Sequence, residues 1–262
     1  MLRFSGIISN YDNMNIAIIG YGKMGHEVEK AAKAKNINII SIIDLSEANT
    51  YKKINQETMS NVDVCIDFSY PAAVISNIKR IAEFKKNIVI GTTGWYDKVE
   101  EARNIVQANN IGLVYSSNFS IGVNIFFKIV ENAAKIINKI DDYDVYGYEL
   151  HHNKKIDSPS GTAKTIGEIL LNNIKRKNKL LFEEIDRKIE QDELHFASIR
   201  AGFIPGTHVI GFDSNADSIE LKHVARNREG FALGALMAAQ FIHNKKGFYD
   251  INDMMKNIFQ ED

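Results

Sequence analysis

The sequence predicts an α/β protein in which a doubly wound parallel sheet is followed by a second domain of the α+β kind. Between residues 15 and 116, short apolar runs alternate with helical patterns, as in parallel sheets with crossover helices. After residue 122 the alternation stops, and two helical stretches are followed by extended runs with a period of two. The 262 residues are enough for two modest domains with sizeable cores.

The first predicted element is a buried strand over residues 15–19, followed directly by a glycine-rich turn. Residues 20–25 read G-Y-G-K-M-G, a helical run follows, and a second apolar run over 37–43 ends at Asp44. In this context G-x-G-x-x-G is typical of Rossmann-type dinucleotide-binding domains, whose glycines let the backbone approach a pyrophosphate at a helix N-terminus. The alternative is a glycine turn in an α/β protein that binds no nucleotide.

Asp44 indicates which dinucleotide the turn would bind. A carboxylate here accepts hydrogen bonds from the adenosine ribose and repels a 2′-phosphate. The next residue, Leu45, is no cationic partner for that phosphate, although Lys23 in the turn can offset the repulsion in part. We therefore expect NADH to be favoured and NADPH to be tolerated.

Three further apolar runs complete the predicted parallel sheet, and each is followed by small or polar residues. The runs cover residues 62–68, 87–90 and 111–115. We expect Asp97 to cap the helix that precedes the last run. The residues at their carboxyl ends are Asp67-Phe68-Ser69, Gly91-Thr92-Thr93 and Ser116-Ser117-Asn118-Phe119. Since ligands bind at the carboxyl ends of such strands, the three segments together favour a binding site over ordinary loops.

The later part of the chain predicts a mixed or mainly antiparallel sheet with two helices. Extended runs cover 144–152, 194–200, 207–213 and 218–223. We expect the highly charged run 175–193 to be a solvated loop or linker. The predicted organisation is an extension (1–13), a dinucleotide-binding domain (14–118, with 227–262 packing back on it), and a substrate-binding and oligomerisation domain (119–226).

The stretch 149–163, E-L-H-H-N-K-K-I-D-S-P-S-G-T-A, concentrates the groups suited to chemistry. If residues 144–152 form a strand, His151 and His152 point to opposite faces, so we expect no metal site. His151 can donate a proton near neutral pH, and Lys155 can stabilise negative charge or donate a proton. Ser160-Gly161-Thr162 before a helical run either cradles an anion or serves only as a helix cap.

This stretch also resembles the signature of the dihydrodipicolinate reductase family, the 4-hydroxy-tetrahydrodipicolinate reductases. The pattern H-H-x-x-K-x-D-x-P-S-G-T is long and specific, and the resemblance covers most of the chain from Met14. It takes in residues 20–25, 67–69, 91–94, 118–124 and 200–202, with Gly206 and His208. Lys23 stands where the family often has arginine, and Leu45 where some members have arginine, which argues against a strong NADPH preference.

The resemblance implies NADH- or NADPH-dependent reduction of a cyclic imine-type dicarboxylate on the diaminopimelate and lysine pathway, by a homotetramer. It implies proton transfer by His151 and Lys155. Substrate carboxylates would be bound by His152, Gly161 and Thr162. Cofactor contacts would come from Gly20, Tyr21, Gly22, Lys23, Met24, Asp44, Gly91, Thr92, Thr93, Ser116, Ser117, Asn118 and Phe119.

Composition restricts the partners. The net charge of -1 implies no nucleic-acid or membrane surface, and no apolar run approaches the ~20 residues of a membrane span. The single cysteine, Cys65, permits no internal disulfide, and we expect a cytoplasmic protein. Two other functions stay open: a dehydrogenase for another small dicarboxylate, and a nicotinamide-binding redox sensor without turnover.

Overall fold

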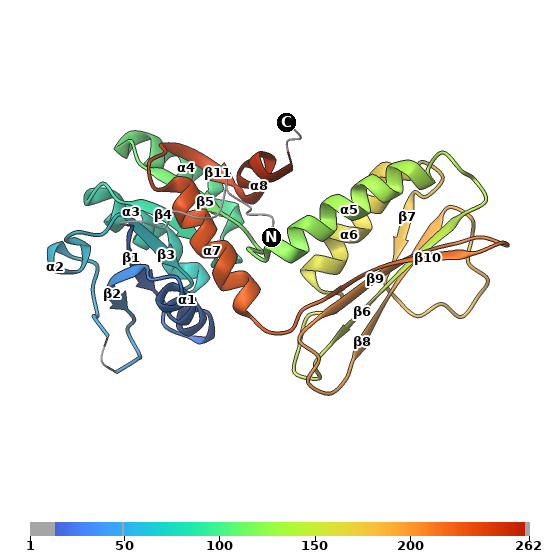
Figure 1. The fold of residues 1–262 in the computed structure, drawn as a ribbon, viewed down its shortest axis with the longest axis horizontal. Coiled ribbons are helices and arrows are strands. Elements are labelled where there is room, and N and C mark those ends of the chain that lie inside the picture. The colour runs from blue at the N-terminus through green and yellow to red at the C-terminus, as the bar shows by residue number, and fades with distance from the viewer. Residues whose placement is uncertain (1–13, 49, 260–262) are drawn as a thin grey trace, which may run out of the picture. The chain divides into compact units, whose positions relative to one another are not determined.

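The structure is a computed structural model that describes residues 14–48 and 50–259. Its described part divides into two compact units (Figure 1). One unit joins the residues up to Ile121 to those from Glu229 onward, and the other is the continuous segment Gly122–Arg228. The predicted fold class is confirmed, because the first unit has a parallel sheet with helices and the second has a mixed sheet.

The first unit is built on a six-stranded sheet of order β11-β5-β4-β3-β1-β2 in which all neighbours are parallel. Its strands are β1 (Asn15–Ile19), β2 (Asn38–Ile43), β3 (Val64–Asp67), β4 (Asn87–Ile90), β5 (Gly112–Tyr115) and β11 (Gly247–Asp250). Its helical segments are α1 (Lys23–Ala34), α2 (Gln56–Met59), η1 (Pro71–Ala73), α3 (Val74–Glu83), η2 (Tyr96–Lys98), α4 (Val99–Asn109), α7 (Glu229–Ile242) and α8 (Ile251–Phe259).

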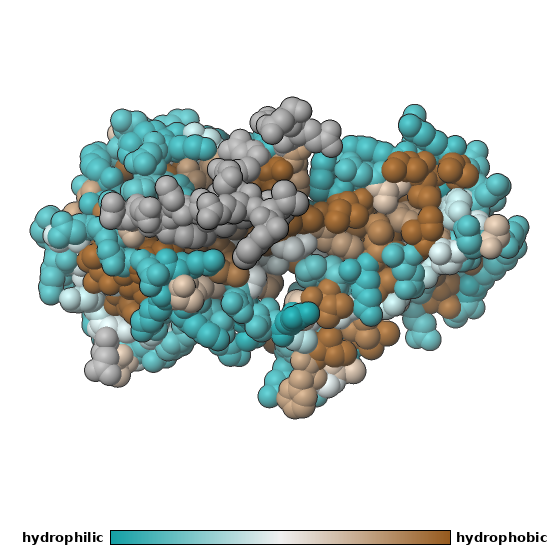
Figure 2. Space-filling view, in the orientation of Figure 1, coloured by the Kyte–Doolittle hydropathy of each residue, from teal (hydrophilic) through white to brown (hydrophobic). Residues whose placement is uncertain are grey.

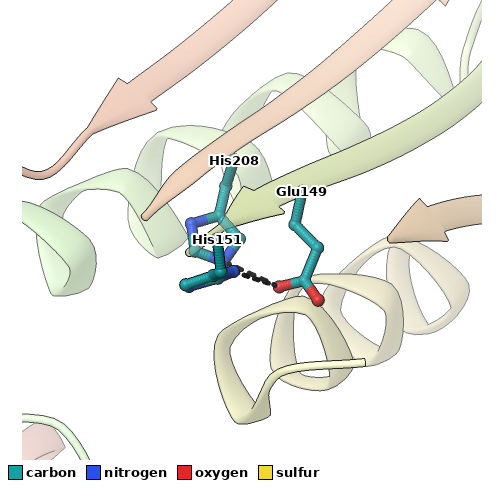
Figure 3. Close-up of side chains that lie close together, drawn as sticks. All are labelled: Glu149, His151 and His208. Carbon is teal, nitrogen blue, oxygen red and sulfur yellow. Dashed lines mark ion pairs between the residues drawn. The ribbon is translucent and has the colours of Figure 1, made fainter. Parts of the chain in front are cut away.

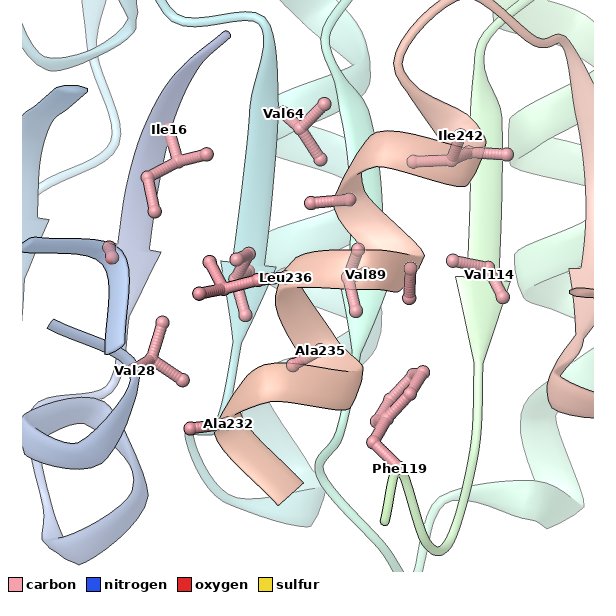
Figure 4. Close-up of a cluster of buried hydrophobic side chains, with 14 of the residues drawn as sticks. Ile16, Val28, Val64, Val89, Val114, Phe119, Ala232, Ala235, Leu236 and Ile242 are labelled. Carbon is pink, nitrogen blue, oxygen red and sulfur yellow. The ribbon is translucent and has the colours of Figure 1, made fainter. Parts of the chain in front are cut away.

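Strand alternation divides the core of this unit into two layers. In β1, Ile16 and Ile18 join the layer with α1 and α7, while Ala17 and Ile19 join the layer with α3 and α4. Figure 4 shows α7 lying across the sheet, with Leu236 directed towards the strand that carries Val64. The last segment of the chain thus supplies part of the central core of the first unit.

Two details of this unit differ from the sequence prediction. Asp97 does not cap a helix: it lies inside η2, and α4 starts at Val99 without a side-chain cap. Strand β11, which extends the sheet beside β5, is not predicted from the sequence. Its four residues, Gly247–Asp250, are all half-buried, so they lack the alternation that identifies a strand.

The second unit has a five-stranded sheet of order β10-β9-β6-β8-β7. Its strands are β6 (Asp144–His151), β7 (Lys179–Leu181), β8 (Glu193–Arg200), β9 (Thr207–Asp213) and β10 (Ser218–Val224). The pairs β10/β9 and β9/β6 are antiparallel, whereas β6/β8 and β8/β7 are parallel. Helices α5 (Ile121–Ile137) and α6 (Gly161–Asn173) share one core with this sheet.

Helix α5 has an apolar exposed side as well as a buried one. Phe126 and Val130 are buried in the core of the second unit. On the outer side, Ile129 and Ile136 are 46% and 62% exposed, and Figure 2 shows apolar surface over this helix. None of the helices in residues 14–48 and 50–259 has the length and apolar character needed to cross a membrane.

Most of the charged run 175–193 is exposed and irregular, as its composition predicts, but its two ends are held in the fold. It contains β7, and Lys177 and Glu193 are both buried. The Lys177 ammonium donates to the carbonyls of Gln191 and Glu193, each at 2.8 Å. Charged side chains can be buried when they have hydrogen-bond partners. Composition alone does not show those partners.

Candidate functional site

The carboxyl ends of five parallel strands lie in one row in the first unit. The last residues of β2, β1, β3, β4 and β5 are Cα partners in sequence across the sheet. The residues that follow them therefore meet at a single edge: Asp44, Gly20, Phe68, Gly91 and Ser116. This edge brings together the segments that the sequence predicts to bind the cofactor.

The three glycines of the 20–25 turn have different surroundings. Gly20 has φ +82, and a Cβ on it would lie 2.5 Å from the Phe68 carbonyl oxygen. A Cβ on Gly25 would lie 2.3 Å from the Gly20 carbonyl oxygen, whereas a Cβ on Gly22 would meet nothing within 4 Å. Packing of the chain itself thus requires Gly20 and Gly25. Gly22 borders open space at the start of α1, where the backbone can approach a pyrophosphate, so the turn fits a dinucleotide.

Asp44 is tied to this turn. Its Oδ2 accepts a hydrogen bond from the Tyr21 N–H at 2.7 Å, and its Oδ1 accepts from the N–H of Ser46 at 2.8 Å. Partial burial raises the pKa of the Asp44 carboxyl, but these bonds outweigh it and lower the pKa to about 2. The carboxylate is therefore ionised near neutral pH. Lys52, which carries no role in the sequence prediction, donates to the Asp44 carbonyl oxygen at 2.9 Å.

A buried carboxylate joins two of the loops at the same edge. Asp67 is fully buried, and its Oδ1 accepts from the hydroxyls of Ser69 at 2.7 Å and Thr92 at 2.9 Å. Burial raises the pKa of Asp67, and the hydrogen bonds oppose that shift in part. The Phe68 ring lies against Gly91, where a Cβ would be 2.1 Å from it. The two loops are thus held in one arrangement by contacts within the protein.

The segment 116–119 follows β5 and is held by its own hydrogen bonds. The Ser116 hydroxyl accepts from the Asn118 N–H and donates to the Asn118 carbonyl oxygen, each at 2.9 Å. The Phe119 side chain is buried in the core with α7. A contact between Phe119 and the cofactor would therefore have to come from its backbone.

The second unit gathers buried polar groups at one end of its sheet. Along β6, Val145, Gly147, Glu149 and His151 share the buried side, the side that packs on the helices. Glu149 is the Cα partner of Ser198 on β8 and of His208 on β9, and His208 is the partner of His223 on β10. The cross-strand pairing therefore places a carboxylate between polar residues from both neighbouring strands.

Glu149 is the centre of this cluster (Figure 3). Its Oε2 lies 3.3 Å from the Nδ1 of His151 and 3.4 Å from the Nε2 of His208. Its Oε1 accepts from the Arg200 guanidinium at 2.8 Å and from the Ser198 hydroxyl at 2.9 Å. Ser160, at the start of α6, donates through its N–H to Oε1 and through its hydroxyl to Oε2. One carboxylate oxygen thus faces the imidazoles, and the other is held by Arg200 and Ser198.

These contacts determine the charge state of the cluster. Burial alone would raise the pKa of Glu149, but the hydrogen bonds from His151, His208, Ser160 and Arg200 outweigh it and lower the pKa far below its ordinary value. Burial lowers the pKa of His208, although Glu149 opposes that shift. Near neutral pH the cluster therefore contains an ionised Glu149 and favours a neutral His208.

Glu149, His151 and His208 also have donor atoms within 4.8 Å of one another, the spacing of a metal site. However, the same carboxylate already pairs with the Arg200 guanidinium. A divalent ion would be repelled by that fixed positive charge, so the arrangement is better suited to orienting the imidazoles.

The other predicted residues of the 149–163 stretch lie just beyond β6. His152 and Lys155 follow the end of the strand, and the Lys155 ammonium pairs with the Asp157 carboxylate at 2.8 Å. Gly161 is the first residue of α6, and a Cβ on it would meet nothing within 4 Å. The start of this helix is therefore open to a ligand, and the Ser160 hydroxyl caps it by accepting from the Ala163 N–H.

Glu149, Arg200 and His208 receive no role in the sequence prediction, although they surround His151. For Glu149 a signal exists: it precedes His151 by two positions in a strand, which places both on one face. For Arg200 the separation from Glu149 is 51 residues, and the strand register that joins them cannot be read from the chain.

Comparison with known proteins agrees with this architecture. Residues 14–119 match the model described as dihydrodipicolinate reductase, N-terminus, and residues 122–255 match dihydrodipicolinate reductase, C-terminus. The 4-hydroxy-tetrahydrodipicolinate reductase of Christiangramia forsetii is 37% identical over 94% of this chain and 100% of its own length. That of Buchnera aphidicola is 41% identical over 76% of this chain and 74% of its own.

A solved structure shows the same fold. The dipicolinate-bound dihydrodipicolinate reductase of Paenisporosarcina sp. TG-14 aligns with a TM-score of 0.73 at 23% identity, over 95% of this chain and 100% of that one. The family models together cover both units, and the relatives span most of the chain. The chain belongs to the dihydrodipicolinate reductase family.

Proposed function

We propose that this chain reduces (2S,4S)-4-hydroxy-2,3,4,5-tetrahydrodipicolinate to tetrahydrodipicolinate with NADH or NADPH, in L-lysine biosynthesis through diaminopimelate. The names of its relatives support the reaction. The observation that carries it is the pairing of His151 with the ionised Glu149, beside the open start of α6. The product lacks the 4-hydroxyl group of the substrate. A hydride and a proton are added, and one molecule of water is released.

In the proposed mechanism, residues of the second unit transfer the proton and stabilise the charge on the substrate. A bound nicotinamide supplies the hydride. His151 supplies the proton through its Nε2, since its Nδ1 faces Glu149. Lys155 stabilises the negative charge that develops on the substrate, or passes it a proton.

We further propose that His152, Gly161 and Thr162 bind the two substrate carboxylates. The start of α6 supports this role, because helix N-termini bind anions through backbone N–H groups and the helix dipole. The open space beside Gly161 leaves room for the anion.

A steady-state assay with freshly made hydroxy-tetrahydrodipicolinate tests the reaction. Purified protein should oxidise NADH or NADPH only when this substrate is present, and pyridine-2,6-dicarboxylate should inhibit competitively. No turnover with either cofactor would refute the proposal. Turnover of a different dicarboxylate without such inhibition would instead indicate another dehydrogenase.

The variant His151→Gln tests the proton-transfer role. Its kcat should fall roughly 100-fold or more, as for loss of a general acid. Its Kd for NADH, measured by fluorescence titration, should stay close to that of the wild type. A variant that loses cofactor affinity but keeps kcat would assign His151 to cofactor binding instead.

We propose that the enzyme has a slight preference for NADH over NADPH. The ionised Asp44 and the exposed Leu45 support it, because neither residue favours a 2′-phosphate. The ratio of kcat/KM for NADH to that for NADPH should be one or higher. A clear NADPH preference that disappears in Lys52→Ala but persists in Lys23→Ala would show that Lys52 supplies a phosphate site.

We also propose that residues 119–226 form a substrate-binding and oligomerisation domain and that the enzyme is a homotetramer. The sheet face opposite the helices supports this, since it carries Ile199 and Val224, which are 47% and 52% exposed. Light scattering should give a tetramer for the wild type and smaller species for Ile199→Lys. We place the enzyme in the cytoplasm, where the unpaired, buried Cys65 suits the reducing conditions.

A further inference from the structure

A positioning role for Glu149 follows from how its two carboxylate oxygens are used. Oε1 receives fixed donors from Arg200 and Ser198, neither of which can take up a proton from it. Oε2 accepts from the Ser160 hydroxyl and faces the Nδ1 of His151 and the Nε2 of His208. The first set of bonds fixes the carboxylate plane, and this leaves Oε2 directed at the imidazole that the proposed reaction uses.

Because the cluster is buried, the electrostatic interactions among its groups are strong. Glu149 is 0% exposed, and His151 and His208 are 8% and 4% exposed. Electrostatic interactions in such a site are less screened than in water. Because Oε2 is an acceptor, it favours a proton on the Nδ1 of His151 in either charge state of the ring.

The contact between the Nδ1 of His151 and the Oε2 of Glu149 is a long one. At 3.3 Å it is longer than an ordinary hydrogen bond, and the buried Nδ1 has no other partner among the described residues. Hydrogen bonds of this kind often tighten when substrate binds. The geometry therefore provides one acceptor for Nδ1 and no competing one.

The other ring nitrogen of His151, Nε2, lies beside Gly206. A Cβ on this glycine would be 3.1 Å from Nε2. Gly206 has φ +155 and no side chain to cover the ring. The Nδ1 of the ring thus faces a carboxylate, and its Nε2 faces a residue that has no side chain.

We propose that Glu149 is a positioning residue that holds His151 with a proton on Nδ1, so that Nε2 is the atom that exchanges a proton with the substrate. This role rests on the proposed function. Three groups hold the carboxylate in place: Arg200, Ser198 and the backbone of Ser160. His208 shares Oε2 and packs edge-on against His151, with ring centroids 5.3 Å apart.

The first test needs only the wild type. Nitrogen-15 shifts of the histidine rings distinguish a proton on Nδ1 from one on Nε2, and the His151 signals are assigned from their absence in His151→Gln. Neutral His151 should carry its proton on Nδ1. A neutral ring protonated on Nε2 would overturn the proposal, whether or not the enzyme turns over the expected substrate.

The second test compares two buried glutamates. Glu149→Gln keeps the shape but removes the charge, and kcat should fall roughly 100-fold, as for loss of an orienting carboxylate or second-shell partner, with little change in KM. Glu193→Gln is the matched control, since Glu193 is 2% exposed and paired with Arg187 and Lys179. It lies five residues before Ser198 in β8, about 16 Å along the strand, so it should lower stability and leave kcat unchanged.

The outcomes separate the two proposals. If the wild type does not turn over, the proposed function fails. If it does, and folded Glu149→Gln keeps both its kcat and the Nδ1 proton of His151, the positioning role fails. If Glu149→Gln does not fold, the tautomer of His151 in the wild type still tests the positioning role of Glu149.

Discussion

Gly206 lies directly beside the Nε2 of His151: a Cβ placed on this glycine would be 3.1 Å from that nitrogen. The residue belongs to the 201–206 loop, which also pairs with the end of β6, since the Ala201 N–H donates to the carbonyl oxygen of His151, the last residue of β6, at 2.9 Å. The loop therefore both pairs with β6 and places a residue without a side chain beside the His151 ring.

A side chain at Gly206 should impair catalysis. In Gly206→Ala the new methyl group crowds Nε2, so kcat/KM for the dicarboxylate should fall about 10-fold or more, as expected when a reacting group is misplaced. Gly202→Ala is the control, because Gly202 also has a positive φ, +51, but a Cβ there meets nothing within 4 Å. Both variants lose stability through backbone strain. Equal kinetic losses in the two would show that strain alone is responsible.

A side chain at Gly22 should weaken cofactor binding without unfolding the protein. Gly22 has φ -76 and faces open space, so Gly22→Val fits the backbone but occupies the space proposed for the pyrophosphate. We expect the Kd for NADH to rise about 10-fold or more and the melting temperature to change little. Gly25→Val should instead unfold the first unit, since its Cβ would lie 2.3 Å from the Gly20 carbonyl oxygen. Unchanged NADH affinity in Gly22→Val would place the cofactor elsewhere.

Protonation of His208 should make the second unit less stable in mild acid. Its pKa is lowered first by burial and also by the charges of His151 and Lys155, and Glu149 opposes the shift. The stabilisation from neutral His208 is therefore fully present above about pH 6.5 and is lost as the pH falls through its lower folded-state pKa. Amide hydrogen exchange in β9 should speed up between about pH 7 and pH 5, after correction for the intrinsic rate. His208→Asn should reduce that pH dependence, and an unaltered dependence would contradict the assignment.

Asn87 should be a large contributor to the stability of the first unit. Its Nδ2 donates to the carbonyl oxygens of Ile242 at 2.6 Å and His243 at 2.8 Å, and its Oδ1 accepts from the Gly112 N–H at 2.7 Å. Asn87→Ala removes these three hydrogen bonds and should cost about 2–4 kcal/mol in the free energy of unfolding. The fluorescence of the only tryptophan, Trp95, reports on this unit during urea unfolding. The control Asn38→Ala, at an exposed position, should cost less than about 0.5 kcal/mol.

The sequence predicts those parts of the molecule whose signals are local. Neighbouring residues in the chain are enough to recognise the turn at 20–25, the run ending at Asp44 and the paired histidines. The fold class follows from the periodicity of apolar residues. The burial of Lys177 and of Glu193 is missed because a run of charged residues is expected to be solvated unless the partners of each charge are known. Glu149 is assigned no role for a related reason: its contacts with Arg200 and His208 depend on the register between strands, which pairs residues far apart in the chain.

The position of α7 has a consequence for the order in which the protein is completed during synthesis. The second unit is one continuous segment, Gly122–Arg228, and so is fully made before Glu229 is added. The first sheet lacks β11 and the covering helix α7 until translation passes that point. Domains usually fold from the N-terminus as they emerge, but here the inserted unit can finish first. Until then the growing chain carries the apolar face of β3, β4 and β5 without the helix α7 that covers it.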